Sequence, residues 1–175
     1  MKSEKEKSFM QLYEPVHANF EKFCKARVYG EMDFQDLMHD TLLIAYKKFD
    51  KVIDPKAFLS FLFGISIRVL SNASKKNKPL LHNDEAMALK ISQPNDQTDK
   101  KTDVTLLYEA LSKLPESQRE SIILYEIVGF SVREIAELHN AGESAVKQRL
   151  ARGRQQLITL LTETKEEIHL KKSVV

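Results

Sequence analysis

The side chains best suited to bind another molecule lie close together in residues 143–157. This segment carries Lys147, Gln148, Arg149 and Arg152, and Glu143 is its only acidic residue. Lys and Arg donate to phosphate oxygens, and Gln can bond bidentately to adenine, so the set predicts contact with DNA rather than catalysis. Lys147, Gln148 and Arg152 fall on one helix face together with Ala151, which would turn all of them toward the same partner.

The elements that must position these side chains are two helices and a tight turn. Ser131 followed three residues later by Glu134 is a capping box, which predicts a helix beginning there. Residues 139–142 (His-Asn-Ala-Gly) then break it. The second helix has one apolar stripe at spacings of four, three and four, formed by Val146, Leu150, Gly153 and Leu157. This geometry fits a major groove; the alternative is an ordinary surface hairpin with solvated charge.

Helical periodicity extends through most of the chain. We expect helices over 8–29, 34–48, 55–73, 104–113 and 116–128, with Asp33 and Asp54 as N-caps and Gly129 as a stop. Residues 79–103 contain Pro79 and Pro94 and little periodicity, and we expect a linker there. The predicted fold class is therefore all-α, with two small helical domains (8–78 and 104–162) joined by a flexible linker. The C-terminal domain contains the helix-turn-helix, and 162–175 should be a frayed tail.

Catalytic and metal-binding patterns are missing from the sequence. The chain has 175 residues, 30% of them charged, no Trp and one cysteine, Cys24, which excludes an internal disulfide. Its five histidines are scattered and no glycine-rich phosphate loop occurs. We therefore expect no cofactor, no metal, no small-molecule substrate and no enzymatic activity.

The N-terminal residues and the longest apolar run bear on localisation. The first ten residues are charged and lack the apolar core of a signal peptide. The apolar run 57–70 contains Arg68 and is short for a membrane span. We expect a cytoplasmic protein without direct membrane insertion.

Both halves resemble one family. In the C-terminal half, Ala110-Leu111, Leu114-Pro115, Arg119, Glu134-Ile135-Ala136 and the run Val146 to Arg152 are similar to the promoter-reading domain of sigma-70-type RNA polymerase sigma factors, in the short extracytoplasmic-function (ECF) group. In the N-terminal half, DFQDLMHDTLLIAYKKFD resembles the segment that binds the polymerase clamp. PKAFLSFLFGISIRVLSNASKK resembles the helix that reads and melts the minus-ten element.

The resemblance implies partners and sites. The partners would be core RNA polymerase, promoter DNA and an anti-sigma factor. The upstream, minus-thirty-five element would be contacted by Arg119, Ser131, Ser144, Lys147, Gln148, Arg149 and Arg152, with Arg119 and Arg149 on phosphate. The minus-ten strand would be held by Phe61, Arg68, Asn72, Lys75 and Lys76. Polymerase would be contacted by Leu37, Asp40 and Thr41.

The sequence departs from the family pattern at several of these sites. The turn reads Asn140-Ala141-Gly142 where the family has Gly, an aliphatic residue and Ser, and Ser144-Ala145 replaces Gly-Thr. Phe61 replaces a tryptophan, and Ile67-Arg68 replaces Arg-Asn. The promoter preference of other members therefore does not transfer to this chain.

Two other functions fit parts of the pattern. In the first, the chain is a stand-alone helix-turn-helix regulator that binds a palindromic duplex as a dimer. In the second, the hairpin docks a protein and has no salt-dependent affinity for DNA.

Overall fold

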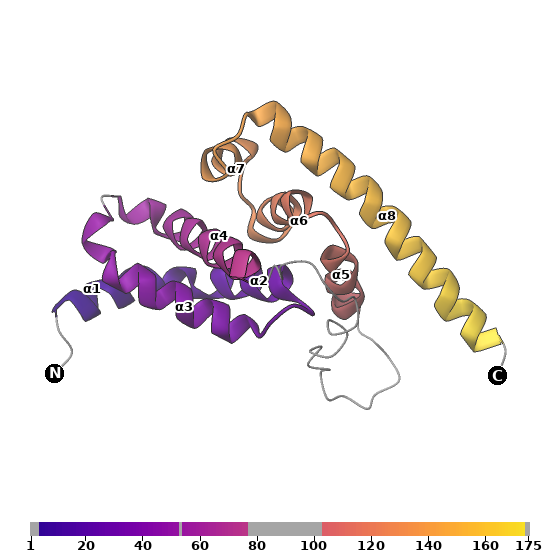
Figure 1. The fold of residues 1–175 in the computed structure, drawn as a ribbon, viewed down its shortest axis with the longest axis horizontal. Helices are drawn as coiled ribbons and strands as arrows, with labels where there is room; N and C mark the ends of the chain where they lie inside the picture. The colour runs from indigo at the N-terminus through magenta and orange to yellow at the C-terminus, as the bar shows by residue number, and fades with distance from the viewer. Residues whose placement is uncertain (1–3, 53, 77–102, 174–175) are drawn as a thin grey trace. The chain divides into compact units, whose positions relative to one another are not determined.

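The computed structural model describes residues 4–52, 54–76 and 103–173, and these residues form helices and turns without a strand (Figure 1). They fall into two compact units, one before and one after residue 92. The all-α, two-unit prediction is confirmed, and the C-terminal unit contains the helix-turn-helix. The proposed linker over 79–103 lies almost wholly outside the described residues, so its boundaries remain a prediction.

The N-terminal unit is built around two packed helices, α3 (Phe34–Lys47) and α4 (Phe58–Lys76). Asp33 caps α3 as expected, because its carboxylate accepts a 2.8 Å hydrogen bond from the Gln35 amide. Helix α2 (His17–Val28) closes the core, and the rings of Phe23 and Phe63 lie 4.6 Å apart between α2 and α4. Burial raises the pKa of the Cys24 thiol, which fits a packing residue.

The predicted helix over 8–29 is wrong as a single element. It begins earlier, as α1 (Glu4–Tyr13), and a 3₁₀ turn at Glu14–Val16 separates it from α2. Pro15 explains the break, since it cannot donate to the preceding turn. Helix α1 is held by Phe9, whose ring contacts those of Tyr46, Phe49 and Phe58.

Helix α4 also differs from the expectation. With the 3₁₀ turn Pro55–Ala57 it gives a stretch, Pro55–Ala73, that is long and apolar enough by length and composition to cross a membrane. The expectation that this apolar run is too short to span a membrane is therefore wrong. The core helix of a protein outside any membrane passes the same test, and here Phe58, Leu62 and Phe63 are buried against the other helices of the unit.

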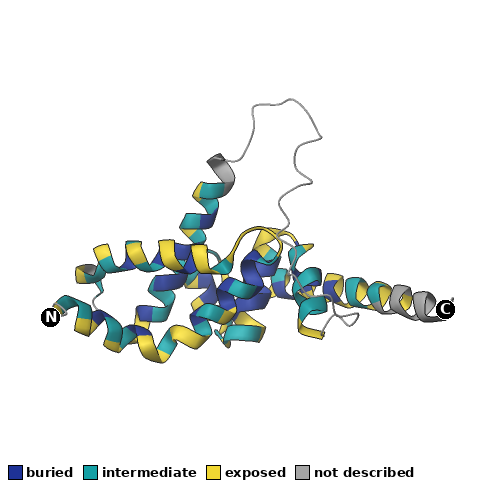
Figure 2. Ribbon diagram, turned by 90° about the horizontal axis from the view of Figure 1, so that it is seen from below, coloured by how far each residue is buried: buried dark blue, intermediate teal, exposed yellow. Residues whose placement is uncertain are grey.

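The C-terminal unit packs three helices against α8 (Glu143–Ser173): α5 (Asp103–Ser112), α6 (Glu116–Ile122) and α7 (Val132–Leu138). After Ile122 the chain widens into a π-helical segment, Ile123–Val128, which ends at Gly129 with φ +88°. The core consists of aliphatic side chains from the four α-helices and the π-helical segment, among them Leu111, Ile122, Ile123, Leu124, Ile135, Val146 and Leu150. In Figure 2 buried positions (dark blue) and exposed positions (yellow) alternate along the helices.

The tail prediction is wrong. Helix α8 continues to Ser173, so 162–173 is helical rather than frayed. Its first half is anchored by packing, and extending an existing helix adds one hydrogen bond per residue without a new nucleation cost.

Candidate nucleic-acid interface

The first four turns of α8 present one polar face and one buried face. Val146, Leu150, Gly153 and Leu157 are all buried, which confirms the predicted stripe. Ser144, Lys147, Gln148, Ala151 and Arg152 are all exposed on the opposite side. We call these five residues the recognition face. The packing of the buried stripe fixes the backbone of this helix, so the side chains of the recognition face keep the same positions relative to one another.

Close approach of α6 and α8 depends on Gly153. A Cβ built at this position would lie 3.0 Å from Ile122 Cγ1 and 3.3 Å from Ile122 Cδ1. Glycine therefore lets Ile122 lie against the α8 backbone, and this contact sets the depth at which α8 sits on α6.

Helix α7, which leads into the turn before α8, is defined by local features at both ends. Ser131 forms the predicted capping box: its hydroxyl accepts from the Glu134 amide at 3.2 Å, and its own amide donates to Glu134 Oε2 at 2.8 Å. The Ser131 hydroxyl also donates to Glu134 Oε2 at 2.7 Å, and this bond, together with the one from the Ser131 amide, lowers the pKa of the Glu134 carboxyl. At the other end Asn140 has φ +47°, a left-handed conformation that Asn tolerates. Because Ser131 sits beside a carboxylate, its position favours capping over phosphate contact.

Arg119 was expected on phosphate, and its surroundings argue against that role. Its side chain is buried, with 7% of the residue exposed. The Nη2 atom donates to the Ser112 carbonyl oxygen at 2.6 Å and lies 3.4 Å from that of Leu114. Arg119 therefore satisfies the carbonyl groups at the end of α5, which a helix leaves without intrahelical partners.

Arg154 lies off the recognition face and contacts the π-helical segment instead. Its Nη2 and Nε atoms lie 2.7 and 2.8 Å from Glu126 Oε1, and its guanidinium stacks 5.3 Å from the Tyr125 ring centroid. This pairing joins α8 to the π-helical segment and neutralises the charge. Lys147, Arg149 and Arg152 thus remain as the basic set near the turn.

A buried polar cluster lies directly under the turn. His139 follows α7 and its side chain is 7% exposed. Its Nδ1 lies 3.3 Å from Arg149 Nη1 on α8, and its Nε2 lies 3.6 Å from Glu120 Oε2 on α6. Burial, with a smaller effect from the Arg149 charge, lowers the pKa of His139 to about 4. The ring is therefore neutral near pH 7. Sequence reasoning missed this cluster, because its three members lie far apart in the chain.

In the N-terminal unit, three of the residues expected at the minus-ten strand share one side of α4. Phe61 is half-buried, and Arg68 and Asn72 are exposed, seven and eleven residues further along the same helix. Spacings of seven and four place all three on one face. The Phe61 ring lies 6.2 Å from that of Phe58. Lys75 and Lys76 belong to α4, and their side chains lie outside the described set.

The residues expected to contact polymerase divide between the core and the surface. Leu37 and Thr41 are fully buried, so as placed they cannot meet a partner, and that part of the expectation is corrected. Both belong to the apolar stripe of α3, which faces α4. Asp40 is exposed, on a surface shared with Asp36, His39, Leu43 and Lys47. Leu43 is 46% exposed and lies among the charged residues of this surface.

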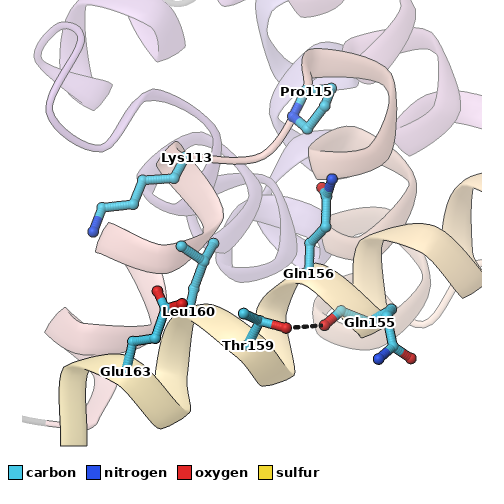
Figure 3. Close-up of a pocket in the computed structure, with 7 residues that line it drawn as sticks. All are labelled: Lys113, Pro115, Gln155, Gln156, Thr159, Leu160 and Glu163. Carbon is cyan, nitrogen blue, oxygen red and sulfur yellow. Dashed lines mark hydrogen bonds between the residues drawn. The ribbon is translucent and has the colours of Figure 1, made fainter. Parts of the chain in front are cut away.

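A shallow groove lies further along α8, beside the turn that joins α5 to α6 (Figure 3). It is lined by Lys113, Pro115, Gln155, Gln156, Thr159, Leu160 and Glu163. The Thr159 hydroxyl donates to the Gln155 carbonyl oxygen at 3.3 Å, which keeps that side chain on its own helix. The predicted DNA-binding residues lie outside this groove.

Comparison with known proteins shows a consistent set of similarities to sigma factors. Residues 105–157, which hold the whole helix-turn-helix, match the family model described as sigma-70, region 4. The chain is 27% identical over 146 residues to the RNA polymerase sigma factor NccH of Alcaligenes xylosoxydans xylosoxydans, covering 78% of each chain. It is 23% identical to the ECF RNA polymerase sigma factor SigM of Mycobacterium tuberculosis, over 88% of this chain and 77% of that protein.

A solved structure shares the fold of this chain. The sigma factor RpoE of Bartonella quintana, solved in complex with the anti-sigma factor NepR, superposes with a TM-score of 0.71 at 23% identity. The match covers 89% of this chain and 98% of that one. The sequence similarity to NccH extends over 146 residues and so beyond the helix-turn-helix, which favours a sigma factor over a stand-alone dimeric regulator. Residues 105–157 thus match sigma-70 region 4, and the chain is similar over most of its length to RNA polymerase sigma factors, among them one of the ECF group.

Proposed function

We propose that this sigma factor selects promoters through the recognition face of α8, placed in the major groove of the upstream, minus-thirty-five element. The observation that carries the proposal is the exposure of Lys147, Gln148, Ala151 and Arg152 directly opposite a buried stripe. Gln148 can bond an adenine bidentately and Lys147 can bond a guanine, each giving roughly 1–3 kcal/mol of discrimination. Ala151 provides an apolar surface for a thymine methyl group.

Phosphate contacts fix the register of this helix on the duplex. We assign Arg149 and Arg152 to this role, with the exposed hydroxyl of Ser144 beside them at the start of α8. We do not assign Arg119 and Ser131 to DNA contact, because their side chains form hydrogen bonds within the fold.

The N-terminal unit supplies the other contacts of initiation. We assign Phe61, Arg68 and Asn72 on α4, with Lys75 and Lys76, to the separated minus-ten strand, where an aromatic ring and cationic side chains can stack on bases and hold phosphate. Asp40 and the exposed Leu43 on α3 form the surface for core RNA polymerase. An anti-sigma factor is a further partner, as for RpoE with NepR. We assign the chain no enzymatic activity and a cytoplasmic location, where promoter DNA and polymerase are found.

The test is a ranking of upstream sequences. Holoenzyme assembled from core polymerase and the full chain is equilibrated with a library of promoter duplexes randomised at the upstream element, and the bound fraction is sequenced. Gln148→Ala should change which bases are preferred at one or two positions. Gln156→Ala is the matched control, because Gln156 is also an exposed glutamine of α8 but lies off the recognition face.

Two outcomes would contradict the proposal. If a Lys147→Ala, Gln148→Ala double variant ranks the library as the wild type does, the base-reading assignment is wrong. If the chain without polymerase binds a palindromic duplex tightly as a dimer, the stand-alone regulator is the better description.

A further inference from the structure

The buried cluster under the turn joins the three helices that carry the DNA-binding hairpin. Glu120 lies on α6, His139 follows the last residue of α7, and Arg149 lies on α8. Glu120 and His139 expose 8% and 7% of their side chains. A hydrogen-bonding histidine at this depth calls for an explanation, since an aliphatic side chain would fill the same space without a polar group to satisfy.

The chemistry of the contact fixes the state of the histidine ring. A guanidinium has only N–H donors, so Nδ1 must accept the bond from Arg149 Nη1. Nδ1 can accept only if the ring is neutral, with its proton on Nε2, and Nε2 faces the Glu120 carboxylate at 3.6 Å. Glu120 therefore favours the tautomer that leaves Nδ1 open toward Arg149.

Arg149 is the only partner of this cluster that reaches the surface beside the recognition face. Its residue is half-buried, while Lys147, Gln148 and Arg152 around it are exposed. The bond to His139 uses one of the five N–H groups of the guanidinium, so others can donate outward. An arginine held in this way loses less side-chain freedom when it binds a phosphate than one that swings freely.

We propose that His139 is a positioning residue that holds the Arg149 guanidinium in place for a phosphate of the upstream element. The inference rests on the proposed function, because it requires that Arg149 meets DNA. His139 itself touches no nucleic acid and acts only through its acceptor atom, Nδ1.

The experiment measures the salt dependence of DNA binding. Holoenzymes carrying the wild-type or variant full chain are titrated with a labelled promoter duplex between about 50 and 200 mM KCl, where one phosphate contact contributes about 0.9 to the log–log slope, or roughly a threefold change in affinity across this range. Arg149→Ala should lower the slope by about one contact. His139→Leu should lower it equally, while the melting temperature of the free chain stays unchanged or rises.

A conservative variant separates positioning from packing. Asparagine carries its Oδ1 acceptor on Cγ, as histidine carries Nδ1, so His139→Asn should restore most of the slope that His139→Leu loses. If His139→Leu keeps the wild-type slope while Arg149→Ala lowers it, His139 does not position Arg149 and only this inference fails. If Arg149→Ala itself keeps the slope, the phosphate assignment in the proposed function fails as well. If both His139 variants lose the slope together with their melting transition, the residue is structural and the inference is overturned.

Discussion

At the scale of single residues, two arginines of the C-terminal unit have opposite surroundings and should give opposite phenotypes. Arg119→Ala removes the donor that serves the Ser112 and Leu114 carbonyl groups from a buried position. We expect it to lower the free energy of unfolding by about 2–4 kcal/mol. The check is the melting temperature of the free chain by calorimetry.

Arg152→Ala is the matched variant for that experiment. Arg152 is exposed on the recognition face, so its loss should leave the melting temperature within a degree or two of wild type and weaken promoter binding. If Arg119→Ala melts like wild type yet weakens DNA binding as Arg152→Ala does, the phosphate role first expected of Arg119 would be restored.

The buried His139 makes stability depend on pH. Its pKa is about 4 in the folded chain against 6.5 for an ordinary histidine, so the unfolded state binds the extra proton first. The contribution to stability is complete above about pH 6.5 and is lost as the pH falls toward 4, up to roughly 3 kcal/mol. Denaturant titrations at several pH values should show a steeper loss for wild type than for His139→Leu. Parallel curves for the two chains would mean that the histidine does not titrate differently on folding.

The residues that sequence reasoning placed correctly are those whose role is local. The recognition face and the stripe beneath it follow from spacing within one helix, and the Ser131–Glu134 capping box follows from spacing across one turn. Arg119, Leu37 and the His139 cluster depend on which other helix covers them. Periodicity placed Leu37 on the apolar side of its helix, whereas the family resemblance suggested a contact with polymerase. Leu37 is buried against α4, which agrees with the periodicity.

At the scale of helices, an end was predictable where a local feature marks it, as with the stop at Gly129, which has φ +88°. Asp33, Asp54 and Ser131 each cap the helix or turn predicted to begin there, because a cap is a local hydrogen bond. The charged end of α8 gave no such signal and continues to Ser173 on the strength of its anchored first half. The π-helical segment after Ile122 is likewise invisible in the apolar pattern, because six residues are too few to reveal a change of helical period.

The packing of α6 on α8 gives the prediction at this scale. Gly153→Val adds three carbon atoms where a single Cβ would already lie 3.0 Å from Ile122 Cγ1. We therefore expect the free energy of unfolding to fall by about 1–3 kcal/mol. Helix propensity alone would favour valine over glycine, so the loss would come from crowding. Ala151→Val, two residues earlier on the exposed side of the same helix, is the comparison in which no buried contact is crowded. Equal melting temperatures for the two variants would show that Ile122 moves aside and that the close approach is not needed.

At the scale of the whole molecule, each unit has its own core and its own network of contacts. Leu62 is buried in the N-terminal unit and Leu150 in the C-terminal unit, with 0% and 3% exposed. The chain divides into two compact units by contacts alone, and the sequence predicts a linker between them. We therefore expect each unit to unfold as a separate cooperative transition.

A matched pair of substitutions tests this expectation. Leu62→Ala and Leu150→Ala each create a cavity in one core and should cost that unit about 2–5 kcal/mol. Hydrogen exchange of the free chain, resolved by peptide, should show faster exchange in α3 and α4 for the first variant and in α6 and α8 for the second. Each variant should leave the protection of the other unit at its wild-type level, because its stabilising contacts are untouched. If either substitution instead lowers protection in both units to the same extent, the two halves fold as one cooperative body and the two-domain description does not hold.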